Sequence, residues 1–196
     1  MSPPRHARIR IVADSRREPL VANSVMGMLI FVITESMLFG GLISAFTIIR
    51  TSALIWPPTG QPRLPVEETA INTAALLASG LMLYLAQRRF VKDPRSAQTP
   101  LLLAMLLGAF FVIFQGFEWV ALIREGLTLT SSSLGGFFYL IVGLHALHAV
   151  VALGVLFNAW WRLRQGWLAQ SLLAAAQVFW YFVVGLWPFL YGVVYL

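Results

Sequence analysis

The chain has no cysteine among its 196 residues, and only 11% of them are Asp, Glu, Lys or Arg. The absence of cysteine excludes disulfides, thiolate metal sites, iron–sulfur clusters and cysteine-ligated copper within this chain. The charged fraction is less than half of the roughly 25% that is typical of soluble domains, and 59% of the residues are hydrophobic. The composition therefore predicts an integral membrane protein with a single membrane domain.

Long apolar segments predict an all-α fold, a polytopic bundle of five transmembrane helices. A helix needs about 20 apolar residues to cross the hydrocarbon core. The predicted spans cover residues 23–49, 69–87, 101–123, 134–161 and 169–196, and together they make one membrane domain over residues 23–196. Residues 1–22 are polar and basic, so we expect a tail on the membrane surface rather than a cleavable signal peptide. The proline-rich stretch 56–65 should be an extended connection.

Basic residues alternate between the two sides of the predicted bundle. The N-terminal tail holds five, the second connection four and the fourth connection two, which puts 11 of the 14 Lys and Arg residues on one side. Because Lys and Arg concentrate on the cytoplasmic side of membrane proteins, we expect the N-terminus in the cytoplasm and the C-terminus outside. The basic residues behind the net charge of +6 then set the orientation in the membrane and contact lipid headgroups. No nucleic-acid partner is expected.

The predicted spans contain four ionisable residues, Glu35, Glu118, His145 and His148. Ionisable groups at membrane depth are costly, so they mark candidate functional sites. His145 and His148 are three residues apart and share one helix face. A rise of about 1.5 Å per residue places Glu118 about 8 Å and His145 about 16 Å from the outer ends of their helices. Neighbouring antiparallel helices would then bring Glu118 and His145 within reach, with Gln115 nearby.

These residues leave several interpretations open. Two histidines and a glutamate suit a metal site, but the chain lacks the Glu-x-x-His pairs of intramembrane di-metal centres. We favour a buried hydrogen bond between Glu118 and His145 that joins two helices. Haem ligation is less favoured, since two histidines on one helix face cannot bind opposite sides of one haem. Glu35 has no evident partner and is expected to stand alone. The residues leave three roles open for it: a step in a proton path, a contact with a lipid headgroup, or a hydrogen bond to a neighbouring helix.

Five motifs occur in order along the chain: MLIFVITESMLFGG (28–41), WPPTG (56–60), NTAALLASG (72–80), QGFEW (115–119) and GLHALHAV (143–150). Together they resemble subunit III of the haem–copper terminal oxidases, the cytochrome c and ubiquinol oxidases, in a short bacterial form with five spans rather than seven. The resemblance covers nearly everything from about residue 23 onward. It assigns Glu35 the place of that family's intramembrane glutamate.

The resemblance implies a non-catalytic subunit of a complex that reduces oxygen to water and translocates protons. Haem and copper are then expected in subunit I, the direct partner, and in subunit II, and no cofactor or metal is expected in this chain. The implied role is to stabilise subunit I, sustain proton uptake and hold phospholipid between helices, in a bacterial inner membrane. An accessory subunit of a nitric oxide reductase is the alternative, and an independent transporter or a stand-alone metalloenzyme fits less well.

The last span departs from the family pattern. Members usually carry a glutamate near its start and a His-Phe-Val-Asp stretch, whereas this chain has Ala174 and Tyr181-Phe182-Val183-Val184. None of these side chains is charged at neutral pH. Trp187 and the terminal aromatic pattern are retained, so we expect the span to keep its packing role and to lose any polar one. Aromatic residues in this span are expected to pack against lipid or a partner subunit.

Overall fold

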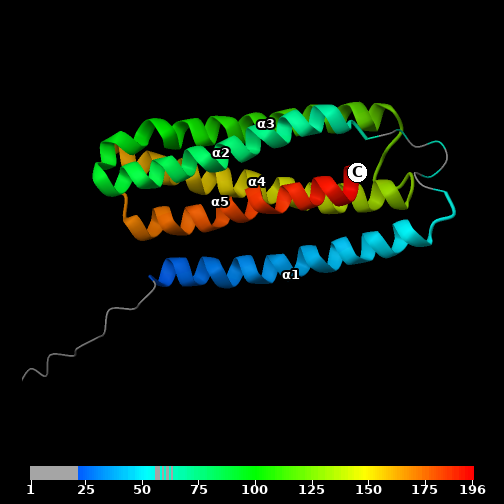
Figure 1. The fold of residues 1–196 in the computed structure, drawn as a ribbon, viewed down its shortest axis with the longest axis horizontal. Helices are drawn as coiled ribbons and strands as arrows, with labels where there is room; N and C mark the ends of the chain where they lie inside the picture. Colours follow the sequence, from blue (N-terminus) through cyan, green and yellow to red (C-terminus); the bar gives the residue numbers. More distant parts are fainter. Residues whose placement is uncertain (1–21, 56–57, 59, 61, 63) are drawn as a thin grey trace, which may run out of the picture.

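A computed structural model describes residues 22–196 except 56, 57, 59, 61 and 63. Over these residues the fold is built from long helices that run back and forth along one axis (Figure 1). They are α1 (Asn23–Ser52), α2 (Val66–Lys92), α3 (Gln98–Arg124), α4 (Ser133–Arg164) and α5 (Gln170–Leu190). A 3₁₀ turn, η1 (Pro94–Ala97), precedes α3, and a π-helical turn, η2 (Tyr191–Tyr195), follows α5.

Within the described residues, five helices are long and apolar enough to cross a membrane. The predicted all-α, five-span membrane fold is therefore confirmed. Most helices extend a few residues past the predicted spans; α2, for example, covers Val66–Lys92 rather than 69–87. The last span is different, because α5 ends at Leu190 and the chain continues as η2. The tail of residues 1–21 and most of the WPPTG motif lie outside the described residues.

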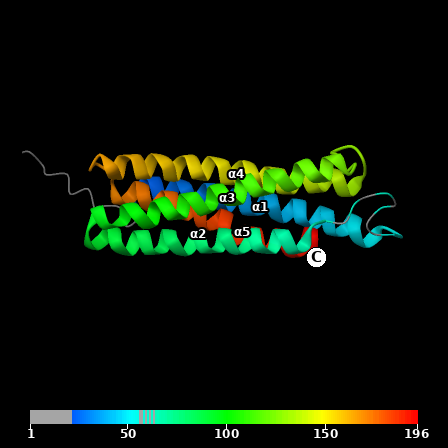
Figure 2. The same ribbon diagram turned by 90° about the horizontal axis from the view of Figure 1, so that it is seen from above.

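The helices α4 and α5 lie between α1 on one side and the pair of α2 and α3 on the other (Figures 1 and 2). The helix α1 packs against α5 and α4, while α2 packs along α3 and also touches α5. Only 11% of the most apolar window of α1 is buried, against 50% for the span of α5 and η2. In a membrane, most of the α1 surface therefore faces lipid or another protein.

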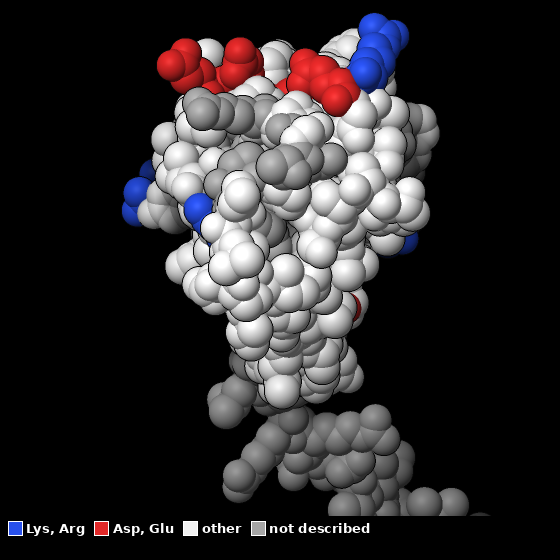
Figure 3. Space-filling view, turned by 90° about the vertical axis from the view of Figure 1, so that its right-hand side faces the viewer, with Lys and Arg blue, Asp and Glu red and all other residues white. Residues whose placement is uncertain are grey.

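The two ends of the bundle differ in charge. One end, called the basic end below, carries Arg88, Arg89, Lys92, Arg95, Arg162 and Arg164 with a single acid, Asp93. The opposite end, called the acidic end below, carries Glu67, Glu68 and Glu125 beside Arg50 and Arg124, and acidic side chains line one edge of it in Figure 3. This polarity fits the predicted positive-inside arrangement. Which end faces the cytoplasm stays a prediction.

The helices α2, α3 and α5 interlock around Trp180. A Cβ on Gly108 would lie 2.5 Å from two ring carbons of Trp180, so only glycine leaves room for this ring. The Trp180 indole N–H donates to the hydroxyl of Ser79 (2.9 Å), and that hydroxyl donates to the carbonyl of Ala104 (2.8 Å). Both Trp180 and Trp187 are fully buried. The expectation that the aromatic residues of this span face lipid or a partner is therefore wrong for Trp180 and Trp187, which pack inside the bundle, whereas Tyr181 and Phe189 are 39% and 70% exposed and face outward.

Candidate functional site

Glu35 of α1 lies beside His148 of α4, about 18 Å along α1 by the helical rise. Glu35 Oε2 and His148 Nε2 are 3.2 Å apart. Glu35 belongs to the narrow stripe of α1, shared with the buried Phe39 and Phe46, that faces the rest of the bundle. The prediction that Glu35 stands alone is therefore wrong. Its partner lies on another helix more than a hundred residues away, so neighbouring sequence gave no indication of it.

One hydrogen bond orients the ring of His148. Nδ1 is 2.7 Å from the carbonyl oxygen of Leu144, which can only accept a hydrogen bond, so Nδ1 carries a hydrogen. Nε2 then points toward Glu35 Oε2 at an ion-pair distance of 3.2 Å, although Oε2 has no partner in hydrogen-bond geometry among the described residues. The nearby imidazole reduces the cost of placing the carboxyl at membrane depth.

Phenylalanine rings enclose most of this pair. Phe31 and Phe39 from α1 and Phe179 and Phe182 from α5 have ring centroids 6.2, 5.6, 6.2 and 6.3 Å from that of His148. The exposed fraction of the His148 side chain is 10%, and that of Glu35 is 18%. The rings exclude water, and electrostatic interactions are stronger in such surroundings. The remaining exposure of Glu35 lies at the weakly buried helix α1.

Glu118 belongs to a second polar cluster, between α2, α3 and η2. The Thr69 hydroxyl lies 3.1 Å from both carboxyl oxygens of Glu118 and donates to the carbonyl of Pro65 (2.6 Å). Gln115 Nε2 donates to Glu118 Oε2 (2.7 Å) and to the hydroxyl of Tyr195 (3.1 Å). The structure thus brings Gln115 and Glu118 together. Sequence reasoning missed Thr69 and Tyr195, because no local pattern shows which way α2 and η2 turn their polar side chains.

His145 is 1% exposed, and neither of its ring nitrogens has a hydrogen-bond partner among the described residues. Its ring stacks on Trp187 at 5.0 Å and meets Phe111 and Phe39 edge-on at 6.2 and 6.5 Å. The predicted hydrogen bond between Glu118 and His145 is therefore wrong. The estimated depths were compatible, but Glu118 turns toward α2 whereas His145 turns toward α5.

The two histidines have different surroundings despite sharing a helix face. His148 has a carboxyl partner, and His145 has aromatic neighbours only. No group of three or more His, Cys, Asp or Glu side chains is placed to hold a metal ion in the described part of the chain. The arrangement offers a carboxyl–imidazole pair at Glu35 and His148 and a hydrogen-bonded carboxyl at Glu118.

Comparison with known proteins identifies the family. The family profile described as cytochrome c oxidase subunit III matches residues 16–196. Cytochrome c oxidase subunit 3 of Thermostichus vulcanus is 29% identical over 177 residues, covering 88% of this chain and 86% of the relative. The subunit 3 proteins of Pelomedusa subrufa and Oryctolagus cuniculus are 33% and 32% identical over 189 and 190 residues, each covering 90% of this chain and 71% of the relative. The chain therefore belongs to the cytochrome c oxidase subunit III family, whose members are membrane-integral subunits of an oxidase complex.

Proposed function

We propose that this chain is a non-catalytic subunit that supports the catalytic subunit of a haem–copper respiratory oxidase. The complex reduces oxygen to water and translocates protons. The chain lies beside subunit I, in one complex with subunit II, in the inner membrane of a bacterium. Haem and copper belong to those partners. Family membership and the membrane-spanning helices support this assignment.

The observation that carries the proposal is the pair of Glu35 and His148. The carboxyl and the imidazole lie at membrane depth with their atoms 3.2 Å apart. They stand at the contact between α4 and α1, and α1 is the least buried of the spans. Glu and His side chains inside membrane spans mark proton relays. We infer that the pair sustains proton uptake by the complex.

The outward surface of α1 supports a role in phospholipid binding. Large apolar side chains cover it; Ile33 is 60% and Met37 is 74% exposed. Three hydroxyls along this helix are paired within it. Thr34 donates to the carbonyl of Phe31, Ser36 to that of Val32 and Thr47 to that of Ile43. Acyl chains are the partners that such a surface accepts without leaving polar groups unpaired.

Purification of the tagged full chain in a mild detergent tests the assignment. A subunit gel and the reduced-minus-oxidised visible spectrum should reveal co-purifying haem subunits, and the preparation should consume oxygen. A preparation that reduces nitric oxide instead would favour the reductase alternative. A colourless chain that purifies alone would contradict the proposal.

The role of the pair is tested by Glu35→Gln in the same complex. We expect haem content and subunit composition to stay at wild-type values while oxygen consumption declines faster during sustained turnover. Glu125→Gln is the matched control, because this exposed glutamate lies outside the pair at the acidic end and its loss should change neither quantity. Equal turnover lifetimes in wild type and Glu35→Gln would exclude the pair from proton uptake.

A further inference from the structure

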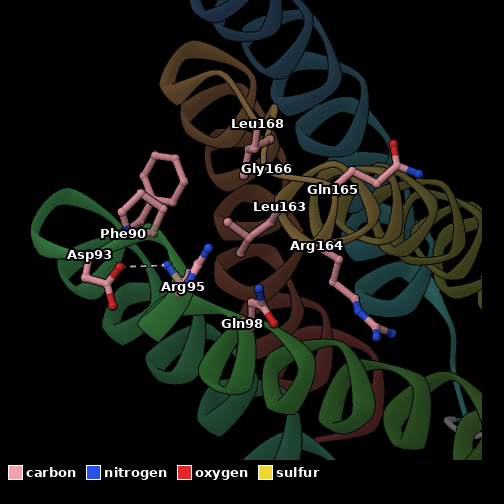
Figure 4. A pocket seen from close by; sticks show the side chains of 10 residues that line it. Phe90, Asp93, Arg95, Gln98, Leu163, Arg164, Gln165, Gly166 and Leu168 are labelled. Carbon is pink, nitrogen blue, oxygen red and sulfur yellow. Dashed lines mark hydrogen bonds between the residues drawn. The ribbon is translucent and has the colours of Figure 1, made fainter.

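Pockets with different charge lie at the two ends of the bundle. Arg95 and Arg164 line the pocket at the basic end (Figure 4). The pocket at the acidic end has a volume of about 310 Å³ and lies between the start of α2 and the end of α3. Its lining includes Glu68, Glu118 and Glu125 and, among the described residues, no Lys, Arg or His. This second pocket reaches Glu118, a buried carboxyl that the proposed function does not use.

The hydroxyl of Thr69 has one hydrogen and three oxygens around it. It lies 2.6 Å from the carbonyl oxygen of Pro65 and 3.1 Å from both carboxyl oxygens of Glu118. Two oxygens approach as closely as the first pair only with a hydrogen between them. A carbonyl oxygen has no hydrogen to donate, so the hydrogen of Thr69 points to Pro65. The hydrogen that joins Thr69 to Glu118 then comes from the carboxyl group.

Gln115 identifies the oxygen of Glu118 that carries this hydrogen. The side-chain nitrogen of Gln115 donates to Oε2 (2.7 Å), so Oε2 accepts. Oε1 is the oxygen left to donate to the hydroxyl of Thr69. Glu118 is then a neutral carboxylic acid, and every hydrogen bond of the cluster has one donor and one acceptor. Neutrality suits the site, because Glu118 is 8% exposed and a buried charge is costly unless it is paired.

Glu118 lies just inside the hydrocarbon layer at the acidic end. It is six residues before Arg124, the last residue of α3, and therefore about 9 Å from the end of the helix. The 27 residues of α3 span about 40 Å against about 30 Å of hydrocarbon, so about 5 Å at each end lies in a headgroup layer. Glu68 and Glu125 are exposed and line the same pocket. The pocket thus connects exposed carboxyls to a buried one across the edge of the hydrocarbon.

Two carboxyls and two phenols are the titratable groups near Glu118 in the part of the chain that the structure describes. Glu68 belongs to α2, Glu125 follows α3, Tyr195 belongs to η2, and Tyr139 of α4 lies beyond Tyr195. None of them carries a positive charge that would hold Glu118 as a carboxylate. We propose that Glu118 is a proton-binding site that exchanges its proton with water through the pocket at the acidic end.

Release of the proton changes one hydrogen bond. When the proton passes from Oε1 to water in the pocket, the hydroxyl of Thr69 turns from Pro65 to the carboxylate, and return of the proton reverses both steps. The site is separate from the pair on α1 and α4. Glu35 lies 17 residues before the end of α1, about 25 Å from the acidic end, whereas Glu118 is about 9 Å from it. Glu118 therefore exchanges with the water at this end of the bundle, independently of the pair.

Infrared difference spectroscopy of the full chain, purified with whatever subunits it binds, tests the bound proton. The spectrum of wild type minus Glu118→Gln at neutral pH should contain the carbonyl band of one carboxylic acid. Glu67→Gln is the control, because this exposed glutamate lies outside the pocket and its difference spectrum should contain carboxylate bands only. Thr69→Val, which removes the acceptor and keeps the shape, should shift the acid band without abolishing it. Carboxylate bands in place of the acid band for Glu118→Gln would overturn the proposal.

Transfer into heavy water tests the exchange. The acid band of wild type should shift within minutes as deuterium replaces the proton. Ala121→Phe adds a ring to the lining of the pocket and should slow this shift at least about tenfold, since exchange then needs local opening of the bundle. Val120→Phe adds the same ring at an exposed neighbour outside the pocket and should leave the rate unchanged.

Two outcomes of the heavy-water experiment would contradict the exchange. A band that does not shift in wild type would mean that the proton of Glu118 is structural only. Equal rates in the two phenylalanine variants would exclude the route through the pocket. The inference requires only a membrane-embedded chain, so its failure would leave haem co-purification, the test of the oxidase role, unaffected.

Discussion

Replacing Glu35 by Leu removes the carboxyl that faces His148 and leaves Nε2 of the imidazole without a partner. Leaving a buried polar group without its partner costs about 1–3 kcal/mol. The 18% and 10% exposed fractions of the two side chains reduce that value, and unfolded chains in a membrane also find other polar partners. We therefore expect each single substitution, Glu35→Leu or His148→Leu, to lower the free energy of unfolding by about 1–2 kcal/mol.

The double variant isolates the interaction itself. The double variant contains neither polar group, so no unpaired carboxyl or imidazole remains. It should therefore lose less stability than the sum of the two single losses. The coupling energy should be about 1 kcal/mol. The measurement is reversible unfolding of the purified chain in bicelles by added dodecyl sulfate, followed by tryptophan fluorescence for wild type, both single variants and the double variant.

A second cycle at Glu118 and His145 is the control, because these residues do not contact each other. Glu118→Leu should destabilise the chain by removing the carboxyl from Thr69 and Gln115, but its effect should be independent of His145→Leu. Coupling at Glu35 and His148 no larger than in this control cycle would refute the reasoning. Coupling in the control cycle alone would restore the pairing that the helix depths suggested.

Two further predictions concern packing. Gly108→Ala should lower the free energy of unfolding by about 1–3 kcal/mol, since the added methyl overlaps the fixed ring of Trp180. Gly154→Ala is its control, because no atom lies within 4 Å of the added methyl. In the same unfolding assay this variant should be neutral or stabilising by up to about 1 kcal/mol. His145→Leu should change stability by less than about 1 kcal/mol, because no hydrogen bond is lost; a loss as large as that of His148→Leu would contradict the unpaired state of the ring.

Hydropathy was sufficient to predict the helices, because a chain that crosses hydrocarbon must satisfy its backbone hydrogen bonds within each span. It placed the ends less well. The α2 helix begins at Val66 and ends at Lys92, since Glu67 and Glu68 at one end and Arg89 and Lys92 at the other are polar yet helical in the headgroup layers. The length of an apolar run in the sequence reflects the thickness of the hydrocarbon core, and the helices are longer than that core.

Contacts within one helix were predictable, and contacts between helices were not. Gln115 and Glu118 are three residues apart, so helical geometry alone brings them onto one face, and they are hydrogen-bonded. Pairing across helices also depends on the rotation of each helix about its axis. The rise per residue gives the depth of a side chain in the membrane but not the direction in which it points. Glu118 and His145 therefore agree in depth without touching, whereas His148, one turn along from His145, contacts Glu35.

The departure of the last span from the family pattern follows from its packing in this chain. Phe182 faces the imidazole of His148 at 6.3 Å, whereas Tyr181 turns outward and is 39% exposed. Val184 lies against Gly80 of α2, and a Cβ atom added to this glycine would lie only 3.1 Å from Cγ1 of Val184. A carboxylate at position 184 would be buried against α2, so valine there favours close packing. The carboxyl and the imidazole of the pair therefore come from α1 and α4, and α5 contributes apolar rings beside the imidazole.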